Sequence, residues 1–363
     1  MVGTGVVTLV IAAIASLFMA WAIGAGSSGS TPFAPAVGAN AISVMRAGFF
    51  VGLLGFLGAV MQGANVSEAV GTELIGGVQL TAIAATTGLL VAAVLVAIGV
   101  FTGYPIATAF TVTGAVVGVG LALGGDPAWG KYQQIGALWI ATPFVGGGVA
   151  YATARFLRAE RVAERIAVPL LAGVVGILLA NISFVFLGPP DRQLSVAGAA
   201  ARSFGGGLAV HAGVSLLVAA IVAVLVGLDV RSDPAAGQRH FLLALGGLVA
   251  FSAGGSQVGL AIGPLVPLSG SIGIPLLALL LGGGLGLLLG SWTGAPRMIK
   301  ALSQDYSSLG PRRSIAALIP SFAIAQAAVF FGIPVSFNEI IVSAIIGSGI
   351  VGANNFGPKL MEL

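Results

Sequence analysis

Two polar segments interrupt an otherwise apolar sequence, and they hold most of the residues with useful chemistry. They span residues 24–32 (GAGSSGSTP) and 252–259 (SAGGSQVG). Glycine lets the backbone turn and expose N–H groups, hydroxyls add donors, and a following helix presents the positive end of its dipole. Such donors bind an oxyanion without a full positive charge. The alternative is two exposed Ser- and Gly-rich loops, but their equivalent places in the two halves favour a binding site. The candidate ligands are Ser27, Ser28, Thr31, Ser256 and Gln257.

A second pair of segments begins at Pro105 and Pro334 and adds Thr108, Ser336 and Asn338 to the candidate ligands. Glu339 follows directly and is surrounded by apolar residues. An ionised carboxylate in such a segment costs several kcal/mol, so we expect it to be protonated, paired or in a wet cavity. We interpret Glu339 as a protonatable coupling residue, with a structural helix cap as the alternative.

The sequence carries no recognisable catalytic or metal-binding pattern. It contains no cysteine, and its two histidines, His211 and His240, lie far apart without carboxylates at ligand spacing. We find no nucleophile with a histidine and an acid, no phosphate-binding loop with its lysine and no dinucleotide fingerprint. We therefore expect no cofactor, no metal and no enzymatic activity, and an intramembrane enzyme is the alternative from a different class.

Composition places the chain in a lipid bilayer. Of its 363 residues 57% are hydrophobic and only 7% are charged, and the mean hydropathy is +1.08. A soluble protein of this length needs a charged exterior, whereas lipid favours an apolar one. The formal charge of +4 does not indicate nucleic-acid binding, because the basic residues lie at the ends of apolar runs. We expect a multi-pass protein of the cell membrane.

Charge-free stretches indicate about ten spanning helices, since each crossing needs about 20 apolar residues. Two stretches, 74–125 and 241–296, are far longer than one crossing and must double back. Their glycines and prolines predict breaks at 102–105 and within 252–274. We therefore expect an all-α fold with broken or re-entrant helices.

An internal repeat divides the chain. Residues 105–118 align with 334–347 at an offset of 229, and two further anchors, beginning at Ala36 and Gly63, recur in the same order at offsets of 225 and 231. We expect a first transmembrane repeat over 1–158, linking helices over 159–240 and a second repeat over 241–363.

Charge indicates that the two repeats are inverted. The segment 65–78 carries two acidic residues and no basic one, whereas its counterpart, 296–313, carries two lysine or arginine residues near its start and two at its end. Basic segments remain in the cytoplasm, so these equivalent segments are expected on opposite faces, with 296–313 cytoplasmic. Inverted repeats with broken helices are typical of transporters whose site lies near the midplane.

These residues resemble the inorganic phosphate transporter (PiT) family of secondary permeases. That family has a Gly-Ala-Asn-Asp-type motif and a Pro-Val-Ser-Thr-Thr-His-type motif in each half. Residues 252–265 (SAGGSQVGLAIGPL) look like the former, and Pro334-Val335-Ser336 and 105–108 look like the latter. Ser27, Ser28, Ser256 and Gln257 stand at the Asn-Asp positions, and Phe110 and Glu339 stand where the family often has histidine.

The resemblance implies a permease that moves inorganic phosphate by alternating access, coupled to Na⁺ or H⁺. Sulfate or another oxyanion is the alternative. Hydroxyls and amides in place of aspartates supply hydrogen-bond donors and remove the repulsion between a carboxylate and the anion. Glu339 favours phosphate instead, because it can accept a proton that phosphate carries. The expected partners are the oxyanion, a coupling cation and the lipid bilayer, with a homodimer as a further expectation and no nucleic acid.

Overall fold

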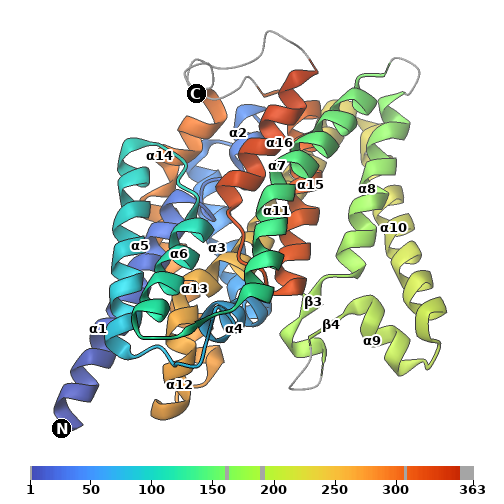
Figure 1. Ribbon diagram of the computed structural model, residues 1–363. Helices are drawn as coiled ribbons and strands as arrows, with labels where there is room; N and C mark the ends of the chain where they lie inside the picture. The colour runs from blue at the N-terminus through green and yellow to red at the C-terminus, as the bar shows by residue number, and fades with distance from the viewer. Residues whose placement is uncertain (1, 160–162, 189–192, 306–308, 352–363) are drawn as a thin grey trace.

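The computed structural model describes residues 2–159, 163–188, 193–305 and 309–351 (Figure 1). Within them, eight helices are long and apolar enough to cross a membrane, and two shorter apolar helices, α6 (Thr108–Ala122) and α16 (Phe337–Ile350), accompany them. The expected all-α multi-pass fold is therefore confirmed. Strands are confined to two short antiparallel pairs, β1 (Ile75–Gly76) with β2 (Asp126–Pro127) and β3 (Ser183–Phe184) with β4 (Leu194–Ser195), in the described residues.

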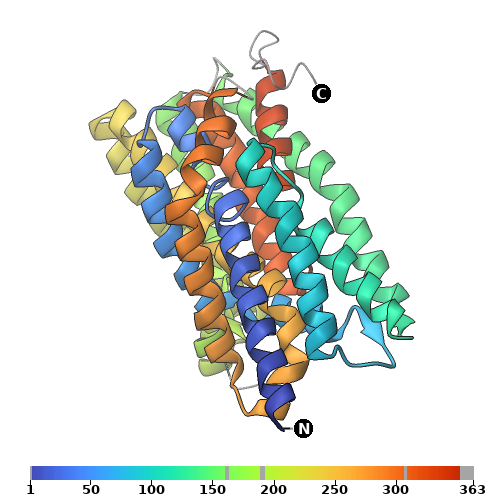
Figure 2. The same ribbon diagram turned by 90° about the vertical axis from the view of Figure 1, so that its left-hand side faces the viewer.

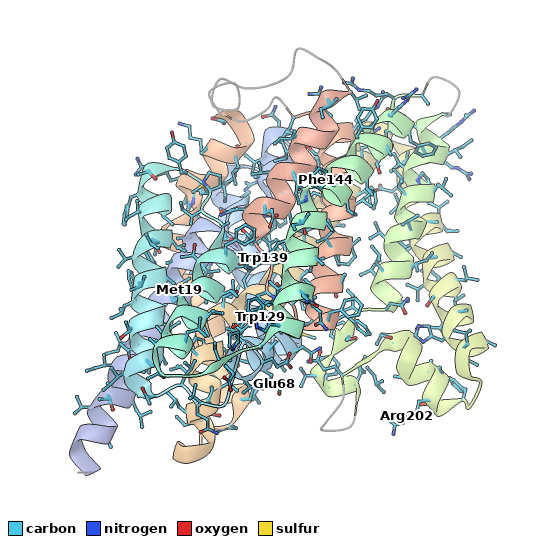
Figure 3. All side chains as sticks on the ribbon, viewed as in Figure 1. Met19, Glu68, Trp129, Trp139, Phe144 and Arg202 are labelled. Carbon is cyan, nitrogen blue, oxygen red and sulfur yellow. The ribbon has the colours of Figure 1, made fainter. Side chains whose placement is uncertain are left out.

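The first group of helices crosses the molecule repeatedly before reaching the linking segment. In Figure 1, α1 rises from the N-terminus, α3 descends, α5 rises, and α6 descends from the middle of the molecule to the lower edge. Trp129, Trp139 and Phe144 follow one another upward along α7 in Figure 3. The bounds are α1 Val2–Gly26, α2 Ala34–Gly38, α3 Val44–Gln62, α4 Ala64–Thr72, α5 Ala82–Thr102 and α7 Trp129–Leu157.

The second group repeats this order with every direction reversed. In Figure 1, α11 descends, α13 rises, α15 descends, and α16 rises from the middle to the upper edge. Likewise α4 lies at the lower edge and α14 at the upper edge, so the predicted inversion is confirmed. The bounds are α11 Pro234–Ile262, η2 Gly263–Leu265, α12 Val266–Ile272, α13 Leu276–Thr293, α14 Ala295–Lys300, η3 Ala301–Asp305 and α15 Pro311–Phe331. Because α11 begins at Pro234, the expected repeat boundary at 241 falls within this helix.

A separate pair of helices links the two groups. Helices α8 (Glu164–Ala180) and α10 (Gly207–Ser232) pack against each other on the right of Figure 1, with η1 (Val185–Leu187) and α9 (Val196–Ser203) below them. Large apolar side chains of α10 are exposed, including Leu216, Leu217 and Leu225. Lipid is the natural environment for such a surface.

Close helix crossings join the two groups to each other. Helix α1 of the first group packs against α13 of the second, with α5 of its own group beside it (Figure 2), and α11 packs against α3. A Cβ at Gly254 would lie 1.8 Å from the carbonyl oxygen of Gly55, and one at Gly24 would lie 2.1 Å from that of Leu287. Only glycine permits such backbone contact. Lipid is as apolar as the side chains, so the hydrophobic effect does not drive membrane helices together, and close packing at small residues does so instead.

The break predicted at 102–105 is confirmed, and the equivalent segment of the second repeat, 331–334, has the same backbone turn. Helix α5 ends with Gly103 at φ 76°, and α15 ends with Gly332 at φ 59°. Both φ values lie in the left-handed region that favours glycine, and the two glycines are 229 residues apart. Prolines 105 and 334 then hold the chain extended until α6 and α16 begin.

The break predicted within 252–274 is only partly correct. We expected the polar segment 252–259 to be unwound, like its counterpart 24–32, but α11 continues as a helix to Ile262. The helix is interrupted at η2, where Pro264 cannot donate to the helical hydrogen-bond ladder. Ser256 and Gln257 therefore project from a continuous helix, whose crossing glycines serve for close approach to α3 rather than for unwinding.

Candidate functional site

The first polar segment forms the turn that ends α1. The backbone N–H groups of Ser27 and Ser28 both donate to Ile23 O, at 2.9 and 3.1 Å. The hydroxyls of Ser30 and Thr31 donate to Ser27 O, at 3.1 and 3.0 Å. Local side-chain bonds thus satisfy carbonyls that the end of the helix leaves open. The side chain of Ser27 takes no part in these local bonds, and the residue is 0% exposed.

Gln257 is the centre of a fully buried polar cluster. Its Oε1 accepts from Thr108 Oγ1 at 2.8 Å and from Ser27 Oγ at 3.3 Å, and Thr108 Oγ1 lies 3.4 Å from Ser27 Oγ. Its Nε2 donates to Val335 O. One side chain of α11 therefore joins the end of α1, the start of α6 and the segment before α16. We name Ser27, Thr108, Gln257 and Asn338 the central cluster.

Asn338 completes the central cluster from the opposite side. Its Nδ2 donates to Gly26 O at 3.0 Å and to Ile106 O at 2.6 Å. The first turn of α16 is thereby attached to the end of α1 and to the segment that leads into α6. Because α6 and α16 run in opposite directions from this point, their N-terminal ends meet there. Neither end has a side-chain cap bond, so first-turn N–H groups are available to an anion.

Several buried oxygens of the central cluster, or of residues next to it in sequence, have no partner in the described part of the chain. They are Ser256 Oγ, Ser336 Oγ, Asn338 Oδ1 and Glu339 Oε2. Buried polar atoms are normally hydrogen-bonded, and each one left without a partner costs about 1–3 kcal/mol. A concentration of such atoms beside two helix N-termini is expected where a polar ligand or ion binds.

The structure brings together most, but not all, of the predicted ligands. Ser27, Thr108, Gln257 and Asn338 are in direct or shared contact, and Ser256, Ser336 and Glu339 are close to them in sequence. Ser28 Oγ instead faces Ile23 O at 3.5 Å, and Thr31 serves the turn. Ser28 and Gln257 do not bond to each other, because the turn after α1 directs Ser27, rather than Ser28, towards α11.

Sequence reasoning missed a second polar network. Gln62 Nε2 donates to Ser183 O at 2.9 Å and to Gln326 Oε1 at 3.3 Å, and Gln326 Nε2 donates to Ser252 Oγ at 2.6 Å. These bonds join α3, α15 and α11. A single glutamine within each of two spanning segments was the available signal, since an isolated amide in an apolar helix needs a partner.

Fold and site together define a class of protein. Two inverted sets of helices, with half-length helices meeting end to end at a buried polar centre, are the architecture of secondary membrane transporters.

Known proteins identify the family more closely. The profile of the phosphate transporter family matches residues 23–361, and the chain belongs to that family. It is a multi-pass membrane phosphate permease. The family is one of transporters, as the resemblance of the two motif pairs predicted.

Curated relatives extend over nearly the whole chain. A "Putative phosphate permease" of Thermococcus kodakarensis is 26% identical over 94% of this chain and 88% of its own length. A "Putative phosphate permease" of Chlamydia muridarum is 27% identical over 94% of this chain and 89% of its own length. A solved structure titled "The sodium-dependent phosphate transporter" shares the fold, with a TM-score of 0.80 and 22% identity over 96% of this chain and 90% of that one.

Proposed function

We propose that the central cluster is the phosphate site and that the permease works by alternating access with a coupled cation. The observation that carries this proposal is the meeting of two oppositely directed half-helices, α6 and α16, at Gln257 and Asn338. Their N-termini direct positive dipole ends at one buried point, which suits an anion. Hydroxyls from both groups of helices supply further donors.

The cluster and the adjacent Glu339 also offer what phosphate needs beyond donors. Phosphate near neutral pH carries protons and therefore benefits from acceptors, whereas sulfate carries none. Asn338 Oδ1 and Glu339 Oε2 are buried acceptors without a partner in the described structure. This arrangement supports phosphate over sulfate, and sulfate transport remains the alternative.

Burial supports alternating access. Ser27, Thr108, Ser256, Gln257 and Ser336 are all 0% exposed, so a ligand at this point has no direct route to either face. Exchange requires a rearrangement that opens one face at a time. The inverted arrangement provides two structurally equivalent routes, because α6 leads towards one face and α16 towards the other.

Uptake into liposomes tests substrate and coupling cation. Purified protein is reconstituted and given radiolabelled phosphate or sulfate under a sodium gradient, a proton gradient or neither. We expect phosphate to accumulate under at least one gradient and to exceed sulfate. Absence of uptake of both anions under every gradient would rule out the transport assignment for this site.

Glu339→Gln separates a proton role from a structural one. The amide keeps the shape of the side chain but cannot exchange a proton, so the pH dependence of uptake should flatten if Glu339 carries the coupled proton. Sodium dependence measured on the same variant tests the other cation. A variant whose pH profile matches that of the original protein would exclude the proton role, provided that its uptake at the optimum is retained.

A further inference from the structure

A groove of about 230 Å³ lies between the upper ends of α3 and α13 in Figure 1, and no residue of the central cluster lines it. The two helices pack against each other and lie side by side in Figure 2. Most of the described basic residues lie at helix ends on this upper face, so the positive-inside rule makes it cytoplasmic. The groove is lined by Met45, Gly48, Phe49, Ser291, Trp292 and Pro296.

Small residues form the floor of the groove. Gly48 and Ser291 are buried, and a Cβ at Gly48 would lie 3.5 Å from Ser291 O. The Ser291 hydroxyl donates to Leu287 O of its own helix at 2.8 Å. The floor therefore offers no free polar side chain, which suits hydrocarbon rather than water.

Aromatic rings form the walls of the groove. Phe49 and Trp292, which are 48% and 40% exposed, stack almost in parallel with ring centroids 5.5 Å apart. Trp292 Nε1 donates to Phe49 O at 3.2 Å, so the indole already has a polar partner and presents its ring to the membrane. Tryptophan at a helix end is typical of the level of the lipid headgroups.

Helix α3 continues the groove as an apolar stripe towards the middle of the bilayer. Arg46, Phe50, Leu53 and Leu57 follow one another at intervals of three or four residues, so they share one face of the helix. All four are exposed. A positive charge at the level of water, followed by exposed hydrocarbon below it, is the order that an anionic phospholipid matches.

Two arginines stand at the rim of the groove, one from each wall. Arg46 directly follows Met45, and Arg297 directly follows Pro296. Both arginines are exposed, and neither forms an ion pair or a side-chain hydrogen bond with any residue that the structure describes. Arg239 brings a third positive charge to the start of α3, because its Nε donates to Ala41 O at 2.9 Å.

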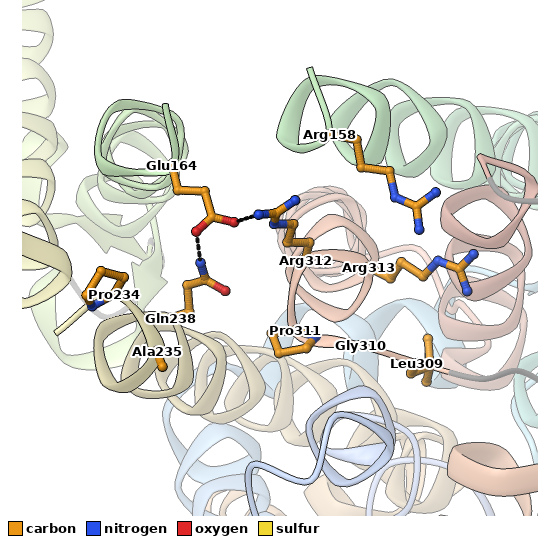
Figure 4. Close-up of a pocket in the computed structure, with 10 residues that line it drawn as sticks. All are labelled: Arg158, Glu164, Pro234, Ala235, Gln238, Leu309, Gly310, Pro311, Arg312 and Arg313. Carbon is orange, nitrogen blue, oxygen red and sulfur yellow. Dashed lines mark hydrogen bonds and ion pairs between the residues drawn. The ribbon is translucent and has the colours of Figure 1, made fainter. Parts of the chain in front are cut away.

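Elsewhere on the same face, arginine charge is balanced within the protein. In the cavity of Figure 4, Glu164 pairs with Arg312 through Oε1 and accepts from Gln238 Nε2 at 2.9 Å through Oε2. No carboxylate lines the groove between α3 and α13. Its positive charge therefore faces the membrane, where the anions are lipid headgroups.

We propose that this groove binds an anionic phospholipid of the cytoplasmic leaflet. The lipid phosphate lies between Arg46 and Arg297, whose planar guanidinium groups fit phosphate oxygens in pairs. The upper part of an acyl chain lies over Gly48 and Ser291, between the rings of Phe49 and Trp292 and the membrane. The site does not depend on the function assigned to the central cluster.

Contact quenching by brominated acyl chains tests the proposal. The chain has no cysteine, so Met45→Cys, an exposed position in the lining, carries the only thiol and receives a bimane fluorophore. The labelled protein is placed in phosphatidylcholine nanodiscs that contain the same low fraction of either brominated phosphatidylglycerol or brominated phosphatidylcholine. Arg46→Gln combined with Arg297→Gln is compared with Arg155→Gln combined with Arg231→Gln, which removes two exposed charges from the same face outside the groove.

We expect brominated phosphatidylglycerol to quench about fivefold more than brominated phosphatidylcholine, the factor for about 1 kcal/mol per arginine near an anionic lipid. The Arg46 and Arg297 double variant should lose this preference, and the control pair should keep it. Unchanged quenching by brominated phosphatidylcholine in every variant shows that each one is still folded and inserted. Equal quenching by both lipids in the original protein, or a preference that survives the double variant, would overturn the proposal. Absence of quenching by either lipid would overturn it as well, because protein, such as a second copy of the chain, would then cover the groove.

Discussion

Gln257 bonds to three partners from three separate segments, and no other side chain of the central cluster has as many. It is an acceptor for Thr108 and Ser27 and a donor to Val335 O. An amide is suited to this position because one group supplies both functions, whereas an aspartate supplies only acceptors and adds a charge. The identity of this single residue therefore decides how the two half-helices are held together.

Gln257→Leu should abolish most transport while the helices persist. Leucine fills a similar volume but leaves Val335 O without its donor, at about 1–3 kcal/mol, and removes the acceptor that Thr108 and Ser27 share. We expect phosphate uptake in liposomes to fall at least about tenfold, since about 1.4 kcal/mol corresponds to a factor of ten. Gln304→Leu, at an exposed position, is the control and should transport normally. Uptake by Gln257→Leu equal to that of the control would contradict the role assigned to the central cluster.

At the scale of elements, the glycine crossings determine how closely the two groups of helices approach. Gly58 and Gly254 lie at the crossing of α3 and α11, and Gly290 lies at the crossing of α13 and α1. Each carries a backbone hydrogen where any Cβ would overlap a carbonyl of the facing helix. The same crossings hold Gln257 and Ser27 at hydrogen-bonding distance, so packing and site depend on the same glycines.

Gly254→Ala should destabilise the fold. Its Cβ would lie 1.8 Å from Gly55 O, which forces α3 and α11 apart, and overpacking of this kind costs about 1–3 kcal/mol. We expect a lower midpoint of thermal unfolding in detergent. Gly282→Ala on α13, where nothing lies within 4 Å, should be neutral or slightly stabilising because alanine favours helix. If both variants unfold at the same temperature, the crossing is less tight than described.

At the scale of the whole molecule, inversion places equivalent segments on opposite faces. Glu68 on α4 and Lys300 on α14 are both exposed and lie at opposite ends of the molecule. The charge difference between the two segments that suggested inversion thus corresponds to a real difference in position. Formation of a homodimer remains a prediction.

Single cysteines at Glu68 and Lys300 test this topology. With no other thiol in the chain, a membrane-impermeant maleimide applied to intact cells should label Glu68→Cys and leave Lys300→Cys unlabelled. Permeabilised cells should label both, which serves as the control for accessibility. Labelling of both variants in intact cells would be incompatible with opposite faces.

Much of this architecture is readable from the sequence, because lipid imposes few solutions. Charge-free runs can only be helices in a bilayer, and the constant offset between Gly103-Tyr104-Pro105 and Gly332-Ile333-Pro334 reflects the need for the same turn twice. The unequal charge of two equivalent segments was sufficient to predict inversion. The residue types of the site were also predictable, since serine, glutamine and asparagine are conspicuous in apolar surroundings.

Tertiary structure alone decided which of these residues meet. The sequence could not show that α11 remains helical through Gly254-Gly255-Ser256-Gln257, because glycine is compatible both with unwinding and with close packing, and only the facing helix α3 distinguishes the two. Nor could it show that Ser27 rather than Ser28 faces Gln257, since adjacent residues in a turn point in different directions. Local chemistry selects the residues, and long-range packing selects their partners.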